Sequence, residues 1–384
     1  MSETIRLGRI AGVAVGISWT VVLVFGLVTT GLAAGRFPEV YPDLAAGAYA
    51  AAGVAAGLLF FASLLAHEVS HAVVARRNGI GVDGITLWLL GGVARLTGEP
   101  RDAGADLRIA AVGPLTSVVL AVCFIAIRWA LWWAGFRGIA LGVFEWLALM
   151  NAVLAAFNLV PAAPLDGGRI LRALLWRWRG DRTMAAVAAA RAGRSFGWLL
   201  VMVGAIDLFA GGALGGPWLI LVGWFIASAA AAEEQDAVVS SVLSEVRAAA
   251  VMTANPEVAP ADISVETFLD DYVFSGHHST FPLVDDRGDL VGLATLKRVK
   301  QAPPGARRSM PLRAVAADLE DVPLVAPDDL VTDVLPRMTR AADGRALVVA
   351  GGRLVGIVSP ADIVRRLELA ELQPQGRKQS AVRQ

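Results

Sequence analysis

The sequence has 384 residues, 56% hydrophobic and only 18% charged, whereas an ordinary soluble domain has about 25% charged residues. This composition excludes a single soluble domain, and the single Cys excludes a disulfide framework. The net charge of zero conceals two halves, because residues 1–232 carry 17 Arg, no Lys and 12 acidic residues, whereas residues 233–384 carry 17 basic and 22 acidic residues. All 11 Trp lie in the first half, which is typical of a membrane domain followed by an acidic soluble domain.

Six apolar stretches are long enough to cross a membrane, which takes about 20 residues of helix. They cover residues 10–34, 48–75, 109–134, 139–160, 193–211 and 215–232. The first is too long for the apolar core of a secretory signal, so we expect a permanent span. Glu145 and Asp207 lie near the predicted outer ends of spans, where they either reach water or serve a function.

Arginines in short loops predict the orientation, because positive residues remain on the cytoplasmic side. They cluster before the first span, after the second and after the fourth. Six spans then place both termini, and everything after residue 232, in the cytoplasm.

The second predicted span contains the sequence His67-Glu68-Val69-Ser70-His71. Residues i and i+4 share one helix face, so the two imidazoles can bind one metal ion while Glu68 reaches a water on that ion. This is the H-E-x-x-H pattern of zinc hydrolases. The alternative is a pair of core histidines bonded to other helices, but these are the only two His residues of the first half.

A catalytic zinc usually has three protein ligands, and Asp166 is the best third candidate. It follows a helix break at Pro161 and Pro164 and precedes Arg169, which marks the same cytoplasmic boundary as the arginines after His71. The alternative roles for Asp166 are a helix N-cap and an ion pair with Arg169.

At these residues the sequence resembles the site-2 protease family of intramembrane zinc metalloproteases, in its bacterial branch with a cytoplasmic pair of CBS modules. The resemblance rests on 67–71, on Gly113-Pro114-Leu115, and on 158–169, which reads Asn-x-x-Pro-x-x-Pro-Leu-Asp-Gly-Gly-Arg. It implies zinc held by His67, His71 and Asp166, with Glu68 as general base. It also implies a β-structured segment against the substrate, and 85–96 predicts two strands around a Gly-Gly turn.

The resemblance implies cleavage of a membrane-anchored substrate near the cytoplasmic side, such as an anti-sigma factor or another transmembrane regulator, in the cell membrane of a bacterium. No nucleic-acid partner is expected. An edge strand could pair with the unwound substrate. Asn158 either stabilises the oxyanion or positions substrate, or else bonds a carbonyl freed at the helix break. We expect the Gly113-Pro114 pair to serve close helix packing.

The second half contains an internal repeat: 258–262 recurs at 325–329, and 290–295 recurs at 354–359. The pattern resembles a tandem CBS module, which implies a homodimer. In that family a hydroxyl residue and a later Asp shape an adenosine-nucleotide site, and the second copy has Ser359 and Asp362. The first copy has Arg298 in place of the Asp, which predicts one nucleotide site with Arg298 free to meet a phosphate. The alternative is a module that only dimerises.

The predicted fold is therefore a polytopic α-helical membrane protein with about six transmembrane helices and a short β-structured segment, followed by a soluble α+β tandem CBS domain. The predicted boundaries are 1–232 for the protease domain, 233–250 for a helical linker, 251–370 for the CBS module (copies at about 251–302 and 312–370) and 371–384 for a disordered tail. The alternative functions are a CBS-gated transporter or channel with a metal site, whose usual paired helix breaks are not evident, and an inactive scaffold.

Overall fold

A computed structural model describes residues 5–88, 91–211, 215–276, 278–341 and 343–372. The chain divides into two compact units, residues 1–237 and 238–384. Most of the predicted tail lies outside the described residues.

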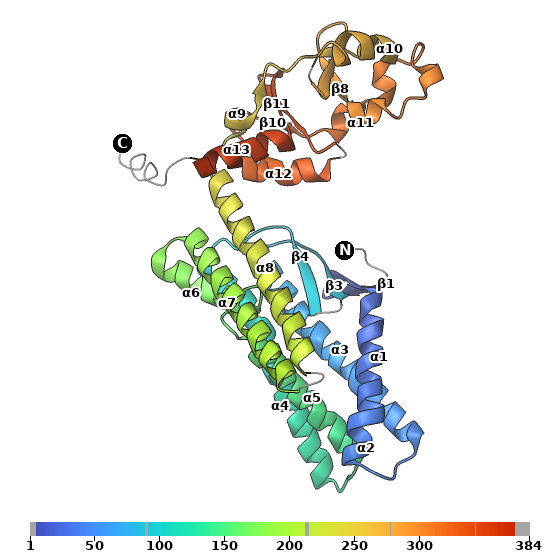
Figure 1. The fold of residues 1–384 in the computed structure, drawn as a ribbon, viewed down its shortest axis with the longest axis vertical. Coiled ribbons are helices and arrows are strands. Elements are labelled where there is room, and N and C mark those ends of the chain that lie inside the picture. The colour runs from blue at the N-terminus through green and yellow to red at the C-terminus, as the bar shows by residue number, and fades with distance from the viewer. Residues whose placement is uncertain (1–4, 89–90, 212–214, 277, 342, 373–384) are drawn as a thin grey trace. The chain divides into compact units, whose positions relative to one another are not determined.

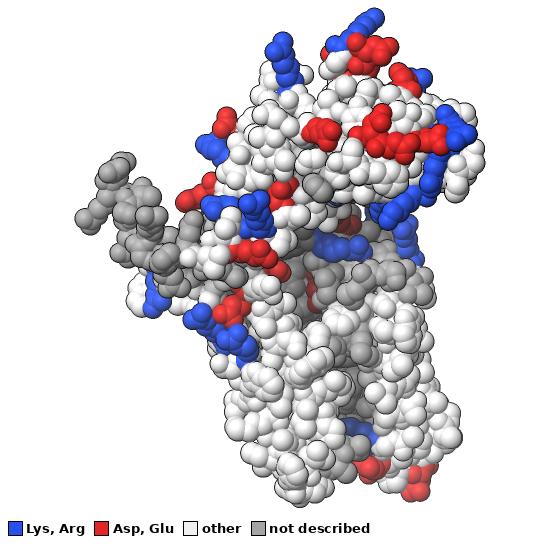
Figure 2. Space-filling model, turned by 45° about the horizontal axis from the view of Figure 1, so that its top comes forward, with Lys and Arg blue, Asp and Glu red and all other residues white. Residues whose placement is uncertain are grey.

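The first unit is a helical bundle with a small sheet at one end (Figure 1). Its helices are α1 (Trp19–Gly31), α2 (Phe37–Val40), α3 (Ala46–Arg77), α4 (Ala103–Trp133), α5 (Ile139–Asn158), α6 (Asp166–Arg179), α7 (Arg182–Phe209) and α8 (Gly215–Leu243), with a π-helical turn, Leu32–Arg36, joining α1 to α2. Within the part of the chain that the structure describes, six helices are long and apolar enough to cross a membrane: Trp19–Val40, α3, α4, α5, α7 and α8. Figure 2 shows a broad region of this unit without charged side chains.

The predicted start of the first span, residue 10, is wrong. Residues Ile5–Ile10 and Val13–Ile17 form an antiparallel hairpin, β1 and β2, and α1 begins only at Trp19. Strand β2 is apolar because its residues Val13 and Val15 are buried in the unit. The apolar sequence therefore runs without interruption from β2 into α1. Hydropathy alone therefore cannot separate the strand from the helix.

The hairpin belongs to a four-stranded sheet in the order β1-β2-β3-β4. Strand β3 (Val82–Trp88) is parallel to β2 and antiparallel to β4 (Gly91–Leu96). The two predicted strands are present, but Gly91 and Gly92 pair with Trp88 and Leu87 inside the sheet rather than forming the turn. Residues 89 and 90, which lie between the two strands in the sequence, are outside the described residues. β4 is an edge strand, so one side of its backbone is open to pairing.

Small residues bring α7 and α8 into close contact. A methyl group on Gly204 would lie 2.6 Å from the carbonyl oxygen of Gly216, and one on Gly197 would lie 2.6 Å from that of Gly223. Membrane helices often pack through such small residues, because lipid gives no hydrophobic driving force between them.

The second unit contains two four-stranded sheets, in the orders β6-β7-β8-β9 and β10-β11-β12-β5. The sheets cross the predicted copy boundaries: β5 pairs with β12, and β9 pairs with β8. Helix α8 enters this unit, where Leu243 is buried in the core around the second sheet. The elements after α8 are, in chain order, α9 (Ala248–Val251), β5 (Thr253–Ala254), β6 (Ala259–Pro260), α10 (Val265–Phe268), β7 (Thr280–Val284), β8 (Leu290–Thr295), α11 (Leu296–Val299), β9 (Ala317–Asp318), β10 (Leu324–Val325), α12 (Val331–Arg340), β11 (Ala346–Ala350), β12 (Arg353–Val358) and α13 (Pro360–Leu372).

Candidate metal centre

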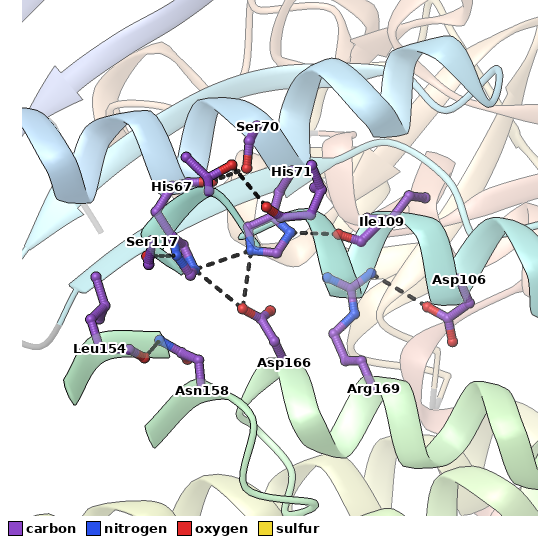
Figure 3. Close-up of polar contacts among 12 residues, drawn as sticks. His67, Ser70, His71, Asp106, Ile109, Ser117, Leu154, Asn158, Asp166 and Arg169 are labelled. Carbon is purple, nitrogen blue, oxygen red and sulfur yellow. Dashed lines mark hydrogen bonds and ion pairs between the residues drawn. The ribbon is translucent and has the colours of Figure 1, made fainter. Parts of the chain in front are cut away.

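His67, His71 and Asp166 converge at one point in the helical unit (Figure 3). The Nε2 atoms of the two histidines are 3.2 Å apart, and Oδ2 of Asp166 lies 3.2 Å from Nε2 of His67 and 3.1 Å from Nε2 of His71. The side chains are 3%, 9% and 12% exposed, respectively. The histidines come from successive turns of α3, and Asp166 is the first residue of α6.

The break between α5 and α6 delivers Asp166 to this point. Gly167 and Gly168 allow the first turn of α6 to pack closely against the segment after α5. A methyl group on Gly167 would lie 2.2 Å from the carbonyl oxygen of Val160, and one on Gly168 would lie 2.2 Å from the backbone nitrogen of Ala163. The N-cap position of α6, Leu165, provides no side-chain hydrogen bond. Asp166 therefore faces the histidines and does not act as the N-cap of α6.

Helix α4 orients both imidazoles. Nδ1 of His71 donates a hydrogen bond of 2.6 Å to the carbonyl of Ile109, and Nδ1 of His67 lies 2.9 Å from Oγ of the fully buried Ser117. Since a carbonyl only accepts, a neutral His71 has its lone pair on Nε2, facing the other two groups. Between these contacts, a methyl group on Gly113 would lie 2.1 Å from Nε2 of His71. The role of Ser117 was not predicted, because no sequence motif includes it.

The three atoms have the composition and spacing of a zinc site. Ligands about 2.0–2.1 Å from a tetrahedral zinc lie ~3.3 Å from one another, close to the separations above. Among the residues that the structure describes, this is the only such group of His, Cys, Asp or Glu. Burial raises the pKa of Asp166, but the adjacent imidazoles of His67 and His71 together outweigh it and lower the pKa to about 2. The carboxylate is therefore ionised at neutral pH, as a metal ligand must be.

Glu68 points to the sheet. The backbone amide of Gly92 in β4 donates a hydrogen bond to its carboxylate, and a methyl group on Gly92 would lie 2.3 Å from Cγ of Glu68. Glu68 therefore lies between the His-His-Asp group and the open edge strand.

The remaining polar candidates lie apart from the three ligand atoms. Nδ2 of Asn158 donates a hydrogen bond of 3.0 Å to the carbonyl of Leu154, four residues earlier in α5. Glu145 forms an ion pair of 3.2 Å with Arg128. Asp207 is half-buried near the start of α8. Arg169 forms an ion pair of 3.5 Å with Asp106, and no ion pair between Arg169 and Asp166 is observed among the described residues.

The predicted nucleotide residues do not form one cluster. The carboxylate of Asp362 accepts hydrogen bonds from the amide and hydroxyl of Ser359, at 2.8 and 2.6 Å. Arg298 instead forms an ion pair of 2.5 Å with Asp343, whose side chain is only 7% exposed. The expectation that Arg298 is free to meet a phosphate is therefore wrong, because its guanidinium is already paired with the buried carboxylate of Asp343.

Fold and site together define a membrane-embedded protein with a buried metal centre of hydrolase type. Peptidase family M50 matches residues 55–138 and 133–203, and the CBS domain matches residues 246–305 and 315–369. The metalloprotease relative Rip3 of Mycobacterium tuberculosis is 42% identical over 375 residues, which cover 97% of this chain and 95% of Rip3.

A zinc metalloprotease of Methanocaldococcus jannaschii is 30% identical over 319 residues, covering 82% of this chain and 85% of the relative. The solved structure of a site-2 protease from the same organism is 28% identical and covers 60% of this chain and 94% of that one, with a TM-score of 0.42. The chain belongs to peptidase family M50, the site-2 proteases. It is a multi-pass membrane zinc metalloprotease with a CBS pair, as the sequence predicted.

Proposed function

We propose that the chain is an intramembrane endopeptidase that cuts transmembrane segments of membrane-anchored regulators near the cytoplasmic side of a bacterial cell membrane. The observation that carries this proposal is the convergence of His67, His71 and Asp166 beside Glu68, next to an edge strand and within a chain of six membrane helices. The arginines at the end of α3 and in the segment that follows it, together with those along α6 and at the start of α7, support a cytoplasmic location for this end of the bundle.

In this proposal His67, His71 and Asp166 hold the zinc ion. Zinc supplies Lewis-acid chemistry that activates water and polarises the scissile carbonyl. Glu68 takes a proton from the attacking water and returns it to the leaving amine, and the Gly92 amide fixes the direction of its carboxylate. Asn158 holds the end of α5 through its bond to Leu154, rather than stabilising the oxyanion.

The substrate backbone binds to β4. A peptide bond inside a membrane helix is protected by the hydrogen bonds of the helix, so cleavage requires local unwinding. Addition of the unwound segment to the open edge of β4 restores those backbone hydrogen bonds. Glu68 lies beside Gly92 of that strand, so a peptide paired there passes close to the general base.

The test is Glu68→Gln in the full-length protein, assayed with a library of single-span membrane reporters that vary in their cytoplasmic juxtamembrane sequence. We expect one zinc per chain in both proteins and a loss of cleavage of about 10²-fold or more in the variant. Equal cleavage by the variant would contradict the role of Glu68. Solute flux through the wild-type protein without any peptide product would support the transporter alternative.

For the CBS pair we propose a homodimer and one adenine-nucleotide site, in the second copy at Ser359 and Asp362. Two observations support the single nucleotide site. In the second copy the Asp362 carboxylate lies at the start of α13, bonded to the amide of Ser359, whereas in the first copy Arg298 is paired with Asp343. Asp362→Asn should abolish ATP binding to the full-length protein, whereas Asp343→Asn should not weaken it. ATP binding that is equal in wild type and Asp362→Asn would restrict the CBS pair to dimerisation.

A further inference from the structure

Asp106 is a buried carboxylate that the proposed mechanism does not use. It lies in α4, is 1% exposed, and accepts two hydrogen bonds from Arg172, at 2.8 and 2.9 Å. Arg169 adds a longer contact of 3.5 Å. A buried charge is costly unless it is paired and hydrogen-bonded, and two-point contact between a guanidinium and a carboxylate fixes the geometry of both groups.

The two arginines are on the helix that carries Asp166, three and six residues after it. The N-terminus of α6 has no side-chain cap and follows a proline-broken segment, so contacts with neighbouring helices supply the restraint on its position. The contact with Asp106 provides that restraint about two turns away from the carboxylate of Asp166.

Asp106 also shares its face of α4 with the groups that orient the histidines. Asp106, Ile109, Gly113 and Ser117 follow one another at intervals of three, four and four residues, which places them along one side of the helix. The Ile109 carbonyl bonds His71, Ser117 bonds His67, and Gly113 leaves room for both rings.

We infer that Asp106 is a positioning residue of the metal centre: by binding Arg172 it fixes α6, and with it Asp166, on the same α4 face that orients His67 and His71. The inference rests on the proposed function, because it assumes that these three residues hold zinc. Arg172 also lies 3.6 Å from Glu233 of α8, so the restraint extends to the last membrane helix.

The test compares Asp106→Asn with Glu234→Gln in the purified full-length protein. Glu234 forms ion pairs with Arg191 and Arg194 and, within the described part of the chain, none with Arg172, so its variant controls for the loss of an ion pair elsewhere in the same unit. Zinc affinity is measured by competition with a chelator, and geometry by the visible absorption of the cobalt-substituted protein. We expect Asp106→Asn to lower zinc affinity 10–100-fold and to change the cobalt spectrum, and Glu234→Gln to change neither.

Arg172→Lys keeps the charge, loses the two-point contact and should act in the same direction, so it decides the question if Asp106→Asn does not fold. Asp106→Glu, which keeps the carboxylate, should restore part of the affinity. Wild-type affinity and spectrum in both Asp106→Asn and Arg172→Lys would overturn the inference and leave the proposed function intact. A wild-type protein without stoichiometric zinc would instead refute the proposed function.

Discussion

Gly113 determines whether the two imidazoles can reach the same point. A methyl group there would lie 2.1 Å from Nε2 of His71 and 2.6 Å from Nε2 of His67, well inside contact distance. Gly113→Ala should therefore displace the rings and lower zinc affinity at least 10-fold, as for the loss of a contact that orients a ligand. Zinc content per chain, measured by elemental analysis, checks this. Gly26→Ala is the matched control, because a methyl group there meets nothing within 4 Å; equal zinc loss in both would contradict the steric argument.

At the residue scale, sequence reasoning identified His67, Glu68, His71 and Asp166, because they belong to compact motifs whose spacing reflects the chemistry. It assigned Gly113 only to helix packing and Gly92 only to a turn, and it gave no role to Ser117 or Asp106. These residues act across tertiary contacts between α3, α4, α6 and β4. A single sequence gives no signal for which helix faces meet, so such residues require the structure.

Among the elements, β4 supports the most direct prediction about substrate. The Gly92 amide points to Glu68 and away from β3. The N–H groups of alternate residues in a strand point to the same edge. The Ala94 amide therefore also points to the open edge of β4. Ala94→Pro removes that donor without removing a bond to β3. We expect cleavage of membrane reporters to fall at least 10-fold with zinc retained. Ala94→Gly, which keeps the N–H, should cleave like wild type; reduced cleavage by both variants to the same extent would argue against strand pairing.

The elements also show where periodicity fails. Long apolar helices were predicted because nothing else in a sequence resembles them, and α3, α4 and α5 begin within six residues of their predicted starts. The β1–β2 hairpin was missed because short buried strands and helices have the same apolar composition. In the CBS pair, the sequence repeat predicts two copies. It does not predict that β5 of the first copy pairs with β12 of the second, or that β9 of the second pairs with β8 of the first, because strand partners far apart in sequence leave no periodic pattern.

At the scale of the whole molecule, the even balance of charge separates into an arginine-rich membrane half and an acidic CBS half. The arginines lie at the end of α3 and in the segment after it, at the start of α7, and along α6, where Arg172 binds Asp106 and Glu233. We propose that they serve two purposes: they bias the orientation of the bundle and they anchor the helix that carries Asp166. Only the first purpose is visible in the sequence.

This charge distribution makes the orientation of the membrane domain testable. The loop between α6 and α7 is flanked by Arg177, Arg179 and Arg182, whereas the loop between α4 and α5 carries only Arg137. Since positive residues are retained in the cytoplasm, alkaline phosphatase fused at Gly135 should be active in bacterial cells, and phosphatase fused at Gly180 or after Leu243 should be inactive. Green fluorescent protein at the same three positions should give the reverse pattern. Active phosphatase at Gly180 would reverse the orientation and place the His-His-Asp centre near the outer surface, contradicting cleavage on the cytoplasmic side.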